Sequence, residues 1–349
     1  MKSKKLSENI LKAVKSRGYK YIELDAVIGA DQIIQRSGEN FRQYMFSFQD
    51  PSGNEMCLRP DLTIVSCLRY LKNRSKTKEK IFYSGKAFRK IEDQGGKIIR
   101  NQIGYEIIGS KNIKQDDNEI IQTSIKTIQK IKKEKLKIEI GNIKLFNLLL
   151  DKLKLPKRWK LRLSRHFWRE KYFESLLKRL ETNSDIDPLA VEVDKERYNK
   201  MKVKNKDQMI GERKISEILN RFNNKIKDPR KFSEGKKTAS IIREYLKISC
   251  PINLAKKKLN SFFLRHKIKI DIKDEFFPLK NKLSKNKIIF STNFGRELEY
   301  YTGMVFSIKN QSNTNLIQGG RYDNLLSNLG AKRKISAVGA AINLNSYDN

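Results

Sequence analysis

The chain has 349 residues, enough for two ordinary domains or one large one, and 38% of them are hydrophobic. Its three cysteines (Cys57, Cys67 and Cys250) form no paired framework and no CxxC motif, which excludes a disulfide scaffold and favours buried thiols in a reducing compartment. No apolar run approaches membrane-spanning length, and the first residues are typical of a charged amphipathic helix, so we expect a cytoplasmic protein without a membrane anchor.

The formal net charge of +36 has two explanations. A polyanionic partner such as RNA or DNA is one. A lysine-biased composition is the other, because Ile, Lys and Asn are abundant throughout and the charges are scattered along the chain. Arginine, the more usual reader of bases and phosphates, is much rarer than lysine, so nucleic acid is not the expected partner.

The first 144 residues alternate between helix and strand patterns. Residues 4–17 predict a helix that Gly18 ends. A strand, a turn and a second strand are expected before Pro60, and a helix after it. Two apolar strands around the tip EDQGGK predict a long antiparallel hairpin. A helix at 116–133 and a strand at 135–141 complete this part.

Residues 145–280 are highly charged and helix-rich, and we interpret them as an insertion into the core. Strand patterns return in KIIFSTN and EYYTGMVFSIK, within a C-terminal part that spans 281–349. GGRYDNLLSNLG predicts a glycine turn into a helix, and ISAVGAAINL a strand or short helix. The predicted fold class is α+β.

Four short motifs stand out, in a fixed order along the chain. They are LRPDLT at 58–63, a hairpin running from Phe88-Arg89 to QIGYE at 102–106, RELEYYTG at 296–303, and GGRYDNLL at 319–326. Each motif alone is a weak signal, but four in this order are a strong one.

In wording and order the motifs resemble the catalytic core of class II aminoacyl-tRNA synthetases, and specifically the histidyl-tRNA synthetases. The resemblance covers roughly residues 1–110 and 285–345. It implies an antiparallel sheet flanked by helices, with the helix-rich segment as an insertion. Parts 1–144 and 281–349 would then form one synthetase-like core.

The chain departs from that pattern where a synthetase holds ATP. Asn345 and Ser346 stand where a glutamate–arginine pair is expected, Ile98 replaces a motif 2 arginine, and Glu297 replaces a glycine. The motif 1 proline is absent, and no anticodon-binding domain is expected after the motif 3 equivalent. ATP activation therefore looks lost or weak.

With those departures, the stretch GENFRQYMF…DPSGNEMCLRPDLTI is similar to the regulatory subunits of ATP phosphoribosyltransferase. That resemblance implies a subunit without catalytic residues or cofactor, acting in the first step of histidine biosynthesis. Its expected partners are a short-form catalytic subunit, L-histidine as feedback effector, and a second copy of itself, giving a homodimer within a hetero-oligomer.

The resemblance also implies a histidine site. Asp61, Thr63 and Gln102 would bind the α-ammonium group, and Arg296 or Arg89 the carboxylate. Glu106 and Tyr301 would bind the imidazole nitrogens, with Tyr300 packing beside them. Asp61 is shorter than the glutamate of true synthetases.

Ordinary structural roles remain open for the same positions. Asp61 could cap the helix after Pro60, and Arg89 could form a surface salt bridge. Gln102 and Glu106 could be ordinary polar positions of a hairpin, and Tyr300 and Tyr301 could belong to a half-buried strand. Gly319 and Gly320 could be turn residues, and Arg321 could form an internal ion pair. His166 and His266 have no metal-binding companions and could be structural. No metal site is expected.

Two other functions compete with the regulatory one. The first is a divergent or truncated histidyl-tRNA synthetase, which Arg89 supports and the altered motif 3 opposes. The second is an RNA-binding synthetase paralogue, which only the net charge supports.

Overall fold

The structure is a computed structural model. It describes residues 2–37, 42, 44–74, 77–90, 98–131, 135–182, 188–202, 208–210, 213–226, 232–272, 276, 287–295 and 300–347. The predicted hairpin tip EDQGGK, most of the loop GENFRQ, and Arg296 and Glu297 lie outside these residues.

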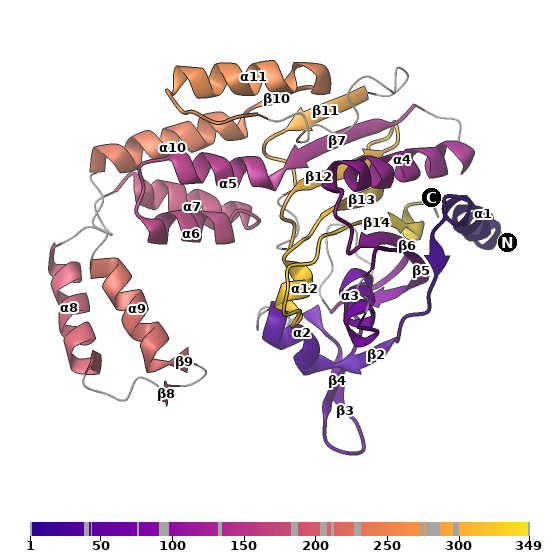
Figure 1. Cartoon of the computed structure of the whole chain (residues 1–349), viewed down its shortest axis with the longest axis horizontal. Helices are drawn as coiled ribbons and strands as arrows, with labels where there is room; N and C mark the ends of the chain where they lie inside the picture. The colour runs from indigo at the N-terminus through magenta and orange to yellow at the C-terminus, as the bar shows by residue number, and fades with distance from the viewer. Residues whose placement is uncertain are drawn as a thin grey trace.

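A nine-stranded sheet runs through the molecule in the order β1-β5-β6-β14-β13-β12-β7-β11-β10 (Figure 1). Its strands are β1 (Lys20–Tyr21), β5 (Glu79–Phe88), β6 (Ile99–Ile108), β7 (Lys137–Asn142), β10 (Ser249–Pro251), β11 (Lys287–Ser291), β12 (Met304–Lys309), β13 (Asn315–Arg321) and β14 (Ala337–Asn343). All neighbours pair antiparallel except β1 with β5 and β7 with β11. The predicted α+β fold with an antiparallel sheet is confirmed, with these two parallel pairs as departures.

Both faces of the sheet are covered by helices. On one face, α1 (Lys2–Lys15) and α4 (Ile113–Ile131) pack onto every second residue of β6, such as Ile103 and Tyr105. On the other face, α3 (Leu62–Lys72) and α12 (Leu325–Asn328) pack against Tyr83 and Ile108. Because side chains alternate along a strand, Glu106 lies on the α3 face.

A smaller sheet stands beside α3, in the order β2-β4-β3. It is formed by β2 (Val27–Gly29), β3 (Ser47–Gln49) and β4 (Glu55–Leu58), and α2 (Ala30–Ser37) packs against it. The stretch at 19–29 therefore contributes β1 to the large sheet and β2 to the small one.

The helix-rich segment contains α5 (Ile143–Lys152), α6 (Lys157–Arg165), α7 (Glu170–Leu180), α8 (Pro188–Lys202), α9 (Ile215–Ile226), α10 (Phe232–Leu246) and α11 (Ile252–Arg265). Helices α5, α6, α7, α10 and α11 share the core of the α1–α4 face. Figure 1 shows α8 and α9 projecting away from the sheet, with β8 (Met209–Ile210) and β9 (Arg213–Lys214) at their tip. The domain limits at 144 and 280 stay predictions.

Two local expectations were wrong. Gly319 and Gly320 lie inside β13, not in a turn. Glycine is needed at both positions because neighbouring groups come too close for a side chain. Tyr300 and Tyr301 precede β12 instead of forming part of it. The final segment ISAVGAAINL does form a strand, β14, followed by the short helix η3 (Leu344–Tyr347).

Cys57, Cys67 and Cys250 are buried free thiols, as predicted. Among the helices in the described part of the chain, none has the length and apolar character needed to cross a membrane.

Candidate functional site

Glu106 lies in a cross-strand row of the sheet in which the two neighbouring strands carry glycine. Gly339 of β14 is directly opposite Glu106, and Gly320 of β13 is opposite Gly339. A Cβ at Gly339 would overlap the Glu106 carboxylate, and a Cβ at Gly320 would lie 2.8 Å from the ring of Tyr301. The two glycines therefore leave the space that Glu106 and Tyr301 fill.

Three hydroxyl groups donate to the Glu106 carboxylate. Thr63 of α3 and Tyr83 of β5 donate to Oε1 at 3.1 and 2.5 Å, and Tyr322 donates to Oε2 at 2.5 Å. A carboxylate has about four lone-pair positions, so one acceptor position remains for a further donor.

Burial dominates the electrostatics of this carboxylate. Glu106 is 1% exposed, and burial raises its pKa from the ordinary 4.5 to about 7, although the hydroxyls of Tyr322, Tyr83 and Thr63 lower it. Near neutral pH, Glu106 can therefore accept a proton or accept a hydrogen bond from a cationic or N–H group.

Asp61 caps α3 and also approaches Arg89. Its Oδ1 accepts from the backbone N–H of Ile64 at 3.0 Å, and its Oδ2 is 3.5 Å from Nη2 of Arg89. Arg89 Nε donates to the carbonyl oxygen of Pro60 at 2.9 Å. The capping role considered for Asp61 is confirmed, and Arg89 is turned toward the start of α3.

Tyr300 and Tyr301 lie beside the same cross-strand row. Their ring centroids are 5.1 Å apart, and the ring of Tyr300 is 5.9 Å from that of Tyr322. Burial, with a smaller effect from Asp61, raises the pKa of Tyr300 well above its ordinary value. Asp61, Thr63, Arg89, Glu106 and the two tyrosines are thus brought together from distant parts of the chain.

Gln102 is less closely connected. It lies on the same face of β6 as Glu106 but four residues away, opposite Gly85 and Asn343. At about 3.3 Å per residue this places it roughly 13 Å along the strand. The role predicted for Gln102 stays a prediction, as does that of Arg296, which lies outside the described residues.

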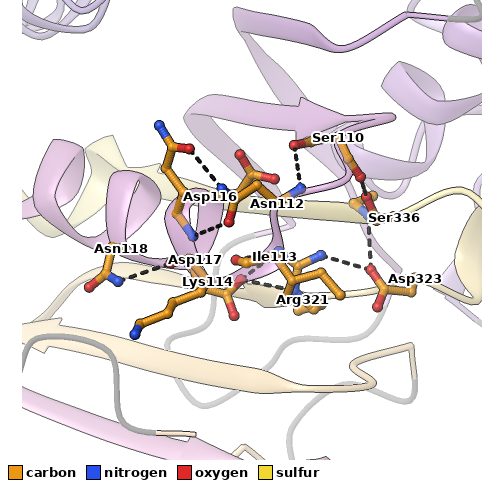
Figure 2. A network of polar contacts seen from close by, with 12 residues as sticks. Ser110, Asn112, Ile113, Lys114, Asp116, Asp117, Asn118, Arg321, Asp323 and Ser336 are labelled. Carbon is orange, nitrogen blue, oxygen red and sulfur yellow. Dashed lines mark hydrogen bonds and ion pairs between the residues drawn. The ribbon is translucent and has the colours of Figure 1, made fainter. Parts of the chain in front are cut away.

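Arg321 forms the internal ion pair considered above (Figure 2). Its side chain is buried, and its Nη2 and Nη1 are 2.6 Å from Asp117 of α4 and 2.9 Å from Asp323. Asp323 also accepts from the backbone N–H of Ala337. The motif GGRYD thus fastens the end of β13 to α4 and to the start of β14.

The two polar residues that follow β14, Asn345 and Ser346, bind backbone groups of neighbouring segments. Asn345 Oδ1 accepts from the backbone N–H of Asn101 at 2.8 Å, and its amide donates to the carbonyl of Ile99. Ser346 donates to the carbonyl of Asn315 at 2.8 Å. Both side chains therefore form hydrogen bonds with backbone groups of β6 and β13.

Sequence reasoning missed Tyr83, Tyr322 and Arg59. Arg59 and Tyr322 stood inside recognised motifs without a role, and Tyr83 lies five residues before the hairpin motif begins at Phe88. Arg59 is buried and donates to carbonyls of Leu24, Asp25 and Lys86, joining the segment before β2 to β5.

The two histidines contact other side chains of the protein. His266 Nε2 lies 2.7 Å from Glu244, and the ring of His166 packs edge-on against Tyr172. Among the residues that the structure describes, no group of three or more His, Cys, Asp or Glu side chains could hold a metal ion.

The fold is that of a class II synthetase-like protein. Solved structures share its fold: a Bacillus halodurans protein titled ATP phosphoribosyltransferase regulatory subunit/histidyl-tRNA synthetase has a TM-score of 0.56 at 19% identity, with 98% of this chain and 77% of that one covered. Histidyl-tRNA synthetase from Nostoc sp. has a TM-score of 0.60 at 14% identity, with 99% and 70% covered.

The sequence comparisons name the family. The model of the histidyl-tRNA synthetase family matches residues 1–346, so the chain belongs to that family. A curated relative from Mesorhizobium japonicum, called ATP phosphoribosyltransferase regulatory subunit, is 26% identical to this chain, with 97% of this chain and 95% of the relative covered. The relative from Rhizobium rhizogenes is 28% identical over 90% and 88%. The resemblance predicted from the motifs is confirmed.

Proposed function

We propose that the chain is a non-catalytic regulatory subunit of an ATP phosphoribosyltransferase. A partner subunit joins ATP to phosphoribosyl pyrophosphate, and this chain is needed for that activity and carries the feedback signal of histidine. Two copies of the chain associate within the hetero-oligomer.

A contrast within one site carries the proposal. The side of the site that would hold an imidazole keeps a buried carboxylate, Glu106, with three hydroxyl donors. The side that would hold ATP has Asn345 and Ser346 bonded to backbone groups. Such a site favours binding an amino acid over activating it. The names of the relatives, matched over nearly their whole length, support the same function.

Histidine would act by linkage. Its imidazole N–H would take the remaining acceptor position of Glu106, and Tyr301 would lie beside the ring. Asp61 and Thr63, at the start of α3, would receive the ammonium group. A ligand that prefers one arrangement of the complex shifts the population toward it, and such couplings are typically about 1–3 kcal/mol.

The test is phosphoribosyl-ATP formation by a short-form catalytic subunit from the same source, with and without this chain. We expect activity only with the chain, and a decline when histidine is added. Activity that is the same in both arms would contradict the proposal.

The alternative is a divergent histidyl-tRNA synthetase, which the family match and the presence of Arg89 favour. Histidine-dependent exchange of pyrophosphate into ATP would identify it. We expect no exchange, since Asn345 and Ser346 are engaged with the backbone.

A further inference from the structure

Arginine is concentrated in one segment, although the positive charge as a whole is scattered. Residues 154–171 contain eight Lys and Arg and a single acid, Glu170. Four of the eight are arginines, whereas the chain as a whole has 22 arginines among its 75 basic residues. Arginine thus makes up half of the basic residues in this segment, against less than a third in the whole chain. We call Arg158, Leu161, Arg162, Arg165, Trp168, Arg169 and Tyr172 the α6–α7 arginine surface.

Aromatic side chains hold several of these guanidinium groups in place. Arg158 and Arg162 lie 5.7 and 5.6 Å from the ring centroid of Trp159, and Arg162 also donates to the hydroxyl of Tyr172 at 3.1 Å. Arg169 lies 4.6 Å from the ring of Trp168. Cation–π contacts of this kind fix the direction of a guanidinium without neutralising it.

Two arginines of this surface, Arg165 and Arg169, form no ion pair within the described part of the chain. Two acids of α7 and its C-terminus, Glu174 and Glu181, bind Arg243 of α10 at 2.8 and 2.6 Å. Burial and then the charges of Arg169, Arg165 and Arg162 lower the pKa of His166. The positive charges of these three arginines thus act on the same side chain.

We propose that the α6–α7 arginine surface docks an acidic surface of the protein partner that a regulatory subunit requires. This inference rests on the proposed function. Carboxylates of the partner would form bidentate hydrogen bonds with Arg165 and Arg169. Leu161, 60% exposed, and Tyr172, 38% exposed, would supply apolar contact beside them.

The side chains fit a protein better than a nucleic acid. Single-stranded nucleic acids need exposed aromatic rings on which bases stack. Here Trp159 is completely buried, and arginines cover the rings of Trp159 and Trp168. Arginine, tyrosine and tryptophan are the residues that most often dominate protein–protein interfaces.

The test compares two charge-matched double variants. R165E/R169E reverses two charges of the surface, and K12E/K15E reverses two exposed charges of α1, at the far end of the molecule in Figure 1. Association of each with the short-form catalytic subunit is measured at low and high ionic strength, and thermal melting verifies folding. R165Q/R169Q serves if the reversed variant does not fold.

We expect R165E/R169E to bind the catalytic subunit about 100-fold more weakly, and K12E/K15E within about three-fold of the unaltered chain. Equal binding by R165E/R169E would overturn the inference, as would equal losses in both variants. Loss of binding to an oligouridylate probe, with subunit association kept, would assign the surface to RNA instead. If the unaltered chain does not associate at all, the proposed function itself fails.

Discussion

The hydroxyl of Tyr322 donates to Oε2 of Glu106 at 2.5 Å, across 216 residues of sequence. This bond joins the turn after β13 to the C-terminal end of β6. It makes the C-terminal part of the core a direct partner of the carboxylate on which the proposed histidine site depends. A change at Glu106 therefore affects ligand recognition and the joining of the two core parts.

Replacing Glu106 with glutamine should weaken histidine binding. The amide keeps the shape but loses the charge, and hydrogen bonds to charged groups contribute about 1.5–3 kcal/mol, or roughly 10- to 100-fold in affinity. Isothermal titration with histidine measures the effect, and association with the catalytic subunit should persist. Unchanged affinity in E106Q would remove Glu106 from the site.

The stability of the protein should depend on pH through the same residue. The folded-state pKa of Glu106 is raised to about 7, so the native state binds its proton more tightly than the unfolded chain. Stability is thus favoured below the ordinary pKa of 4.5 and is lost as pH rises toward 7, by on the order of 3 kcal/mol.

Urea unfolding between those two pH values tests this dependence. E106Q should show a flatter pH profile than the unaltered chain. Asp117, whose pKa burial raises to about 6, titrates in both proteins, so the difference between the two profiles isolates Glu106. Parallel profiles would contradict the assignment.

Replacing Arg321 with methionine should destabilise the fold by about 3–5 kcal/mol, because Asp117 would remain buried without its cation. Adding D117N should recover part of the loss, since the pair is then removed together. Equilibrium denaturation of both single variants and the double variant measures the coupling. Strictly additive losses would show that the pair in Figure 2 is not coupled.

Gly339→Ala should cost about 3 kcal/mol or more, since its Cβ would displace the Glu106 carboxylate from its three hydroxyl donors. Gly29→Ala is the matched control, because a Cβ on that β2 glycine meets only the side chain of Gln32, at 3.6 Å. Thermal melting compares the two. Equal melting temperatures would mean that glycine at position 339 is not required for packing around Glu106.

Local patterns predicted the elements well where short-range rules decide them. Asp61 after Pro60 marked the start of α3, and apolar runs marked the β5–β6 hairpin. The glycine pair at 319–320 was misassigned, because its close neighbours Met304 and Gly339 come from other strands. For the same reason Tyr322 was not found as a partner of Glu106, nor Asp117 as a partner of Arg321, because each pair is more than 200 residues apart in sequence.

The most direct test of the account is to titrate the short-form catalytic subunit with this chain and follow phosphoribosyl-ATP formation, with and without histidine. The account predicts a rate that rises to a plateau as the complex saturates, and that histidine then lowers in the unaltered complex but much less in the E106Q complex. The account would be contradicted by a rate that does not depend on the concentration of this chain. It would also be contradicted by equal histidine inhibition of the unaltered and E106Q complexes.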